Sequence, residues 1–326
     1  MRPIRLRPGI GLTLVFSLIL LSGCTDRPSQ TWKLAEGGLY AGAISPAADR
    51  VAVGTIFHGG SLWQIPEYER LFDWNLDADL NLNDFSAFTA IAVSGDGRRV
   101  ATAQGRQLVI WSAVEGRSET FFEAPAMIRS VALDHTGERF ALGLEEGTAA
   151  VFTADSGAVI QRLIGHRGGV HSLALSPDGR HALTGGDDRR VIYWSVDDGL
   201  IRQHRRHDNQ VRTVALAASG VYAFSAAQGS DGEVWNTSSG NVVRTIPAAR
   251  RVISVARFID GDNGLLVGDR RHSVTHWNLQ SMERLGRWRL DGPGLYGRES
   301  NVILDVRPHP SGVLALSSSG KLALLQ

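Results

Sequence analysis

The sequence predicts an all-β protein made of seven copies of a four-stranded unit. The first observation is a recurring strand-like segment, rich in β-branched and small apolar residues. Its copies are LYAGAIS from Leu39, FTAIAVS from Phe88, IRSVALD from Ile128, VHSLALS from Val170, VRTVALA from Val211, VISVARF from Val252 and VILDVRP from Val302. The second observation is their spacing of 49, 40, 42, 41, 41 and 50 residues. The third is the turn signal after most copies, such as SGDGRR or SPDGR, where Asp caps the turn and Gly supplies a positive φ.

Each unit also supplies further strands. A second segment follows the turn, as in RVAVGT and HALTGG, and a third ends on an aromatic or bulky apolar residue in most units, as in RVIYWSV. A fourth leads into the next unit, as in GAVIQRLIGH. Four short strands at a period of about 40 residues are the signature of a β-propeller, so the chain is predicted to form a seven-bladed ring.

The ring is predicted to be closed by the N-terminal strand. The seventh unit stops after its third strand at Gln326, whereas QTWKLAE around Trp32 belongs to no unit. Residues 30–36 would therefore complete the last blade, and this closure removes the exposed strand edges that favour aggregation. The propeller is accordingly assigned to residues 31–326.

Unit four resembles the repeat of the WD40 family. The match is almost position for position over residues 165–195, GHRGGVHSLALSPDGRHALTGGDDRRVIYWS, and a weaker resemblance covers residues 31–326. Unit three departs from it with Phe152 at the tryptophan position, and unit seven has only leucines there.

In WD40 blades, a His, a Ser or Thr, an Asp and a Trp form a hydrogen-bonded relay. The resemblance assigns these roles to His166, Thr184, Asp188 and Trp194. Such a relay is physically reasonable, because buried polar groups need partners and these side chains are complementary donors and acceptors. It points to a structural role rather than catalysis. Unit five keeps the remaining members in His207, Ser225 and Trp235, with Gly229 at the aspartate position and Asp231 as the candidate substitute.

The first 24 residues read as a secretory signal. They contain three arginines, an apolar run from Ile10 to Leu21 and small residues before Cys24. The alternative is an uncleaved anchor helix, for which the apolar run is short. The motif LSGC resembles the bacterial lipobox, which implies a signal peptide over residues 1–23, a lipidated cysteine at position 24 and a tether through residue 30. Because Thr25 rather than Asp follows the cysteine, the resemblance implies the periplasmic face of the outer membrane rather than inner-membrane retention.

The composition and motifs indicate no enzyme. Without the three leader arginines, 31 basic and 33 acidic residues remain, a net charge of −2 that does not call for nucleic acid. The chain has one cysteine and no GxxxxGK[ST], HExxH or GxSxG motif, and its ten histidines do not recur once per unit. We therefore expect no catalytic residue, no metal site and no cofactor. The alternative is a propeller enzyme of the lactonase or quinone-dependent dehydrogenase type. The Gly-rich GPGLYGRES at 292–300 is interpreted as a loop rather than a phosphate site.

The first strands carry a small residue near the middle, which suits the crowded region where blades converge. These residues are Ala43, Ala92, Ala132, Ala174, Ala215 and Ala256.

A candidate binding patch comes from the loops of units four to six. In this fold, the loops between strands two and three and between successive blades share one face, the usual partner-binding face of the family. Nine arginines fall in these loops: Arg167, Arg189, Arg190, Arg205, Arg206, Arg250, Arg251, Arg270 and Arg271. Arginine suits an interface because its planar fork binds carboxylates in a bidentate manner.

Two interpretations of the patch remain open. In one it binds an acidic surface of another envelope protein, with an anionic glycan or lipid headgroup as the alternative ligand. In the other, nearby acids such as Asp187, Asp188, Asp208 and Asp269 neutralise it and it is merely solvated. The two long spacings place insertions on the same predicted face. Phe72, Trp74, Trp288 and Tyr296 are either aromatic anchors for a partner or, for some of them, packing residues of fourth strands.

Overall fold

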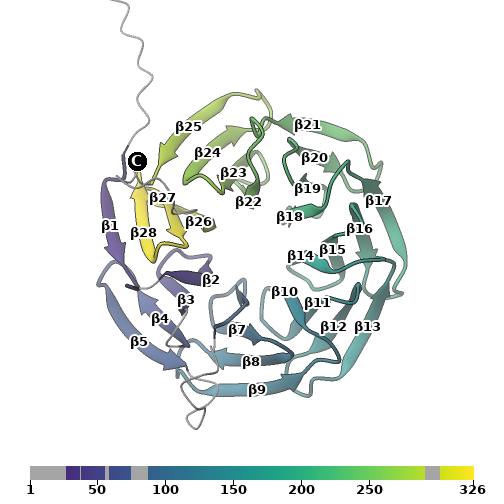
Figure 1. Cartoon of the computed structure of the whole chain (residues 1–326), viewed down its shortest axis with the longest axis horizontal. Helices are drawn as coiled ribbons and strands as arrows, with labels where there is room; N and C mark the ends of the chain where they lie inside the picture. The colour runs from purple at the N-terminus through teal and green to yellow at the C-terminus, as the bar shows by residue number, and fades with distance from the viewer. Residues whose placement is uncertain (1–26, 37, 56–58, 75–86, 291–301) are drawn as a thin grey trace, which may run out of the picture.

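The strands form seven antiparallel sheets around a central axis. The computed structural model describes residues 27–36, 38–55, 59–74, 87–290 and 302–326. Within these residues there are 28 strands, arranged as seven four-stranded sheets. Figure 1 shows the sheets as blades of a ring, with the first strand of each nearest the axis and the fourth at the rim. The predicted seven-bladed propeller is confirmed.

The first four blades follow the chain in order. Blade one contains β2 (Leu39–Ile44), β3 (Arg50–Thr55), β4 (Gly60–Gln64) and β5 (Glu69–Trp74). Blade two contains β6 (Ala90–Val93), β7 (Arg99–Gln104), β8 (Gln107–Ser112) and β9 (Ser118–Glu123). Blade three contains β10 (Ile128–Leu133), β11 (Arg139–Leu144), β12 (Thr148–Thr153) and β13 (Val159–Ile164). Blade four contains β14 (Val170–Leu175), β15 (His181–Gly186), β16 (Arg190–Ser195) and β17 (Ile201–Arg206).

The last three blades complete the ring. Blade five contains β18 (Val211–Leu216), β19 (Tyr222–Ala227), β20 (Gly232–Asn236) and β21 (Val242–Ile246). Blade six contains β22 (Ile253–Ile259), β23 (Gly264–Asp269), β24 (Ser273–Asn278) and β25 (Arg284–Arg289). Blade seven contains β26 (Ile303–His309), β27 (Gly312–Ser317), β28 (Lys321–Leu325) and β1 (Gln30–Lys33).

Blade seven is built from both ends of the described chain. Strand β1 pairs antiparallel with β28, with Trp32 opposite Leu322. The contact extends beyond the strand, because the Leu34 N–H donates to the Gly320 carbonyl at 2.7 Å. The predicted closure of the ring by the N-terminal strand is confirmed.

Antiparallel pairing gives the ring two distinct faces. The turns between strands two and three and the connections between blades lie on one face, which we call the upper face. The turns between strands one and two and between strands three and four lie on the other, the lower face. The two long connections, at residues 75–86 and 291–301, lie outside the described residues, as do Tyr296, Cys24 and the predicted signal.

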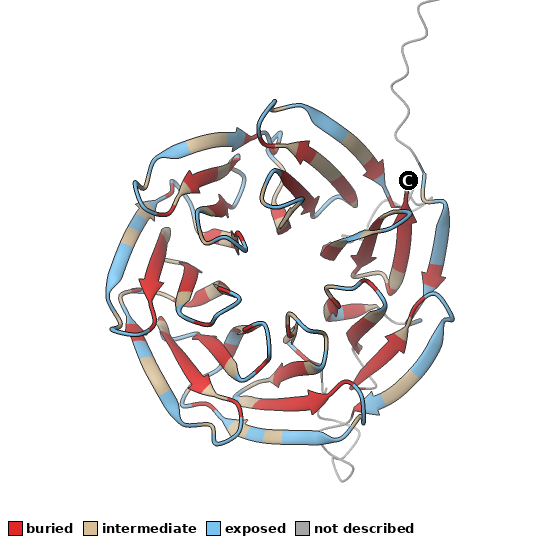
Figure 2. Cartoon of the chain, turned by 180° about the vertical axis from the view of Figure 1, so that it is seen from behind, coloured by how far each residue is buried: buried red, intermediate tan, exposed pale blue. Residues whose placement is uncertain are grey.

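The core lies between the blades. Second and third strands are buried along most of their length, whereas fourth strands alternate between exposed and partly buried residues (Figure 2). This follows from each sheet being covered on both faces by neighbouring blades, so that apolar residues are favoured at consecutive positions. In blade three, Phe152 stacks on Phe140 with ring centroids 4.9 Å apart, which fills the place of the missing tryptophan.

Two of the aromatic residues considered as partner anchors belong to this core. Trp74 is 1% exposed, stacks on Trp111 and donates its Nε1–H to the Gly116 carbonyl at 3.1 Å. Trp288 donates to the Gln326 carbonyl at 2.8 Å. Both are packing residues in the structure.

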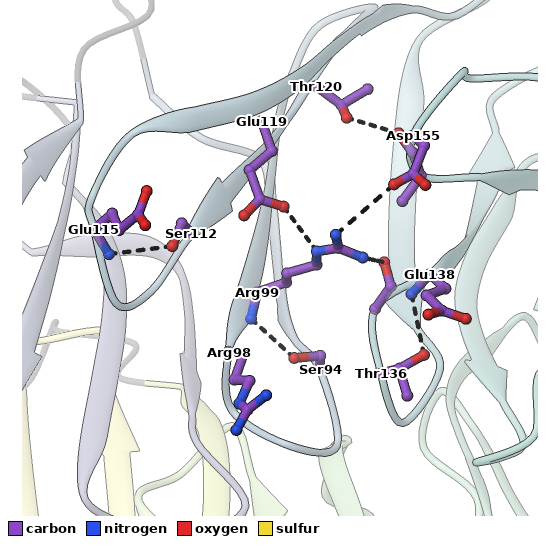
Figure 3. A network of polar contacts seen from close by, with 12 residues as sticks. Ser94, Arg98, Arg99, Ser112, Glu115, Glu119, Thr120, Thr136, Glu138 and Asp155 are labelled. Atoms are coloured by element: carbon purple, nitrogen blue, oxygen red, sulfur yellow. Dashed lines mark hydrogen bonds and ion pairs between the residues drawn. The ribbon is translucent and has the colours of Figure 1, made fainter.

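A recurring arginine at the start of the second strand links each of the first three blades to the next. Arg50 donates to the Ala113 carbonyl at 3.0 Å, and Arg139 donates to the Gly179 carbonyl at 3.3 Å. Arg99 donates to the Gly137 carbonyl of the next blade at 3.1 Å and pairs with Glu119 of its own blade at 2.7 Å (Figure 3). The sequence signal for these inter-blade contacts is an arginine directly after the first turn of the unit.

Candidate functional site

The four side chains assigned to the relay lie together in blade four. His166 Nδ1 lies 2.9 Å from Asp188 Oδ1, and His166 Nε2 lies 2.8 Å from Thr184 Oγ1. The Trp194 indole N–H donates to the same hydroxyl at 2.8 Å. Because the carboxylate accepts from Nδ1–H, Nε2 is the acceptor for the threonine hydroxyl. Thr184 therefore donates one hydrogen bond and accepts another.

The relay fixes the turn between β15 and β16 on the upper face. The Asp188 carboxylate also accepts from the Arg167 N–H at 3.0 Å and from the Arg190 N–H at 3.1 Å. Burial alone would raise the pKa of Asp188, but the hydrogen bonds from His166, Arg167 and Arg190 together lower it below its usual value. Arg189, at the tip of the turn, has a left-handed backbone with φ of 68°. The buried relay thus holds the turn that carries Arg189 and Arg190.

Blade five has a shorter version of this network. His207 Nε2 lies 2.9 Å from Ser225 Oγ, which accepts from the Trp235 N–H at 3.2 Å. Asp231 instead accepts from the Ala248 N–H at 2.8 Å. Within the described chain, Asp231 does not bond to His207, so it does not replace the aspartate that is missing from the relay of blade five.

Blade two keeps only the last link of such a network. The Trp111 indole N–H donates to Thr102 Oγ1 at 2.8 Å, and both residues are buried.

Three of the nine patch arginines are held by the protein itself. Arg205 forms an ion pair with Glu233 at 2.7 Å and donates to the Gly240 carbonyl at 2.7 Å, so it links blade four to blade five. Arg251 pairs with Asp269 at 3.0 Å, and Arg190 donates to the Gly165 carbonyl at 3.2 Å. These three guanidinium groups are occupied by intramolecular contacts.

The other six arginines are exposed on the upper face of blades four to six and the connections between them. Their side chains have no hydrogen-bond or ion-pair partner within the part of the chain that the structure describes; they are Arg167, Arg189, Arg206, Arg250, Arg270 and Arg271. Arg250, like Arg189, stands at a left-handed backbone position, with φ of 61°.

Within the described residues, none of the four acids named above, Asp187, Asp188, Asp208 and Asp269, forms an ion pair with these six side chains. Asp188 faces the relay, and Asp187 lies 2.9 Å from His171 Nε2. Asp269 is 7% exposed, pairs with Arg251 and accepts from the N–H groups of Arg271 and Ser273. These three carboxylates therefore contact other groups, whereas Asp208 is exposed two residues after Arg206 and offsets part of the positive charge there.

The described residues hold neither a metal-binding cluster nor a membrane-spanning helix. No group of three or more His, Cys, Asp or Glu side chains there is arranged to hold a metal ion. Nor is there, in the same residues, a helix with the length and apolarity needed to span a membrane.

A family of repeats matches blade four. The family described as "WD domain, G-beta repeat" matches residues 157–195, from the turn before β13 to the end of β16. This segment includes all four members of the relay, His166, Thr184, Asp188 and Trp194.

Curated proteins show a more distant similarity over more of the chain. THO complex subunit 3 of Arabidopsis thaliana is 29% identical over 129 residues, which is 39% of this chain and 41% of the relative. A guanine nucleotide-binding protein subunit beta of Oryza sativa subsp. japonica is 24% identical over 253 residues, 69% of this chain and 64% of the relative. The chain thus spans less than two thirds of the length of these relatives. Together, the repeat and the relatives support a relationship to WD40 proteins, whose fold is typical of protein-interaction scaffolds.

Proposed function

We propose that this chain is a lipid-anchored scaffold that binds an acidic segment of another envelope protein through the upper face of blades four to six. The anchor is the lipid on Cys24, and the location is the periplasmic face of the outer membrane. The single observation that carries the binding proposal is a set of six exposed arginines on neighbouring parts of one face, none of which has a side-chain partner among the described residues.

The physical case rests on the number and placement of these side chains. One exposed ion pair contributes only about 0.2 to 1 kcal/mol, so a single arginine would not make a binding site. Several guanidinium groups on a rigid ring can act together, because the backbone that carries them loses little conformational entropy when a partner binds. Their planar donors suit carboxylates, which makes an acidic protein segment the favoured ligand.

The upper-face arginines can be tested by a matched pair of charge reversals. The test variant is Arg206→Glu with Arg270→Glu, which leaves Arg205 and its contact with Glu233 intact. The control is Arg98→Glu with Arg284→Glu, which makes the same change in net charge at exposed lower-face positions. Partners are captured by crosslinking in cells and identified after co-purification from membranes.

We expect the test variant to lose the partner and the control to retain it. Capture should also weaken as salt concentration rises, because exposed charges are screened over about 8 Å at physiological ionic strength. Equal capture by both variants would contradict the proposed surface. Binding to vesicles of anionic lipid that depends on the same arginines, without a protein partner, would favour a headgroup ligand instead.

The lipid anchor needs its own experiment. The intact mass of the mature protein should correspond to a chain that begins at Cys24 and carries acyl groups, and the protein should fractionate with the outer membrane. A Cys24→Ser variant should lose the acyl mass. An N-terminus elsewhere, or retention in the inner membrane, would refute this part of the proposal.

A further inference from the structure

The central channel widens into a cavity at the lower face of the ring. The cavity measures about 390 Å³, and its lining comes from the first strand of every blade and from turns that follow those strands. Most lining residues are alanine, valine, leucine or glycine, so short apolar side chains line part of the cavity, although its exposed wall as a whole is more polar than apolar.

The register of the first strands places seven equivalent residues around this cavity. In blade four, Val170 pairs with Gly186, and Ala174, four residues later, pairs with Leu183. By the same counting from Ile253 and Ile303, the equivalent residues in blades six and seven are Arg257 and Arg307. The other five blades place alanine there, at Ala43, Ala92, Ala132, Ala174 and Ala215.

This register corrects one sequence expectation. The sequence pattern predicts Ala256 at the convergence of the blades, whereas in the structure Arg257 occupies the position equivalent to the other alanines. The alignment of strand β22 is shifted by one residue from the one that the sequence pattern predicts, because Ile253 rather than Val252 pairs with Asp269.

The two arginines share one buried carboxylate. Arg257 Nε donates to Asp305 Oδ1 at 3.0 Å, and Arg307 Nε lies 3.9 Å from Asp305 Oδ2. Asp305 is 1% exposed and also accepts from the Ile44 N–H at 2.9 Å. One negative charge therefore faces two positive charges, and this part of the wall carries an excess positive charge.

Arg307 retains donors for a ligand. Its Nε donates to the Ile44 carbonyl at 3.3 Å, and its Nη atoms have no partner among the described residues. Burial, together with the neighbouring charge of Arg257, lowers the pKa of Arg307 to about 10, so the side chain stays protonated at neutral pH. An anion beside it would relieve the charge imbalance.

The opposite wall limits the charge of that anion. Blade three contributes Asp134 and His135 to the lining. One Asp134 oxygen is buried without a hydrogen-bond partner in the described chain, and burial raises the pKa of this carboxyl group. A second acid nearby makes a multiply charged ligand unfavourable.

We propose that this cavity binds a small monocarboxylate with an apolar tail. The carboxylate would receive hydrogen bonds from the planar guanidinium of Arg307, beside Arg257, and the tail would lie against the ring of alanines. A cavity of this size that combines apolar side chains with a few convergent charged groups can hold a small molecule and fix its orientation. The site opens on the face opposite the partner-binding surface proposed above and does not depend on it.

The test titrates the purified full-length protein with sodium hexanoate in a calorimeter, with inorganic phosphate and sodium chloride at matched ionic strength as comparison probes. Hexanoate should bind saturably, and phosphate and chloride should not. Arg307→Ala should weaken hexanoate binding by at least about tenfold, because a charged hydrogen bond is lost. Ala174→Leu should weaken it similarly by filling the cavity without changing its charge.

The matched control is Arg206→Ala on the upper face, which should bind hexanoate as the unmodified protein does. Circular dichroism establishes that each variant is folded. Absence of saturable hexanoate binding would overturn the proposal, as would binding that survives both Arg307→Ala and Ala174→Leu. Phosphate binding as tight as that of hexanoate would reject the monocarboxylate assignment.

Discussion

Replacing Thr184 by valine removes one hydroxyl from the blade-four relay and almost nothing else. Valine has nearly the same shape as threonine, and Thr184 is 0% exposed, so the packing is preserved. The hydroxyl serves two partners, His166 Nε2 and Trp194 Nε1, each 2.8 Å away. Both partners are buried, so no water can readily replace the lost group.

The expected cost follows from those two contacts. A buried donor or acceptor left without a partner costs about 1 to 3 kcal/mol, so Thr184→Val should lower the free energy of unfolding by about 2 to 6 kcal/mol. Thr102→Val in blade two is the matched control, because Thr102 is equally buried and accepts from Trp111. Only one partner is lost there, so the cost should be about 1 to 3 kcal/mol.

The assay is urea unfolding of the purified protein, followed by far-ultraviolet circular dichroism so that all blades contribute to the signal. If the dependence of unfolding free energy on urea concentration is the same for both variants and the unmodified protein, the shift in the urea midpoint measures the change in stability. A Thr184→Val variant as stable as the unmodified protein would refute the role of the relay. If Thr102→Val were destabilised more than Thr184→Val, the loss of stability would not depend on how many hydrogen-bond partners the hydroxyl serves.

Three further predictions concern other parts of the ring. Arg99→Met should lower stability by about 1 to 3 kcal/mol through loss of the contacts with Glu119 and the next blade, whereas Arg98→Met, an exposed neighbour, should change urea unfolding little. Folding lowers the pKa of Asp188, so its contribution to stability should be full above the unfolded pKa of 3.8 and disappear as pH falls through the folded pKa. An Asp188→Asn variant should therefore lose less stability on acidification, measured by thermal unfolding over a series of pH values. Trp32→Ala should cost about 3 to 5 kcal/mol, and amide hydrogen exchange should speed up in β28 before other third strands; uniform acceleration in all blades would argue against a local closure.

The fold could be predicted because its signal is repeated. Seven units in register, each with a turn and a set of apolar strands, leave few alternative architectures. In a closed ring, the strand around Trp32 can pair only with the incomplete seventh unit. The members of the blade-four relay could be assigned because each occupies a fixed place in a well-preserved repeat. Blade five shows the limit, since Asp231 is near the right place in sequence but bonds to Ala248.

The state of the arginines could not be predicted from the sequence. Arg205 and Arg206 are neighbours, yet successive side chains of a strand point to opposite sides. Arg205 therefore reaches Glu233, which lies 28 residues later, while Arg206 faces solvent. The channel arginines were missed for a related reason: a shift of one residue in register exchanges Ala256 for Arg257.

Closure of the ring also sets an order in time. The Ser29 N–H donates to the Leu324 carbonyl across 295 positions of sequence, so this bond must await synthesis of the last blade. Contacts this distant in sequence slow folding. Meanwhile a nascent chain with six finished blades still exposes strand edges at both ends of an open arc, and such edges invite association with other chains. The most vulnerable moment in the life of this protein should therefore be the interval before β28 meets β1.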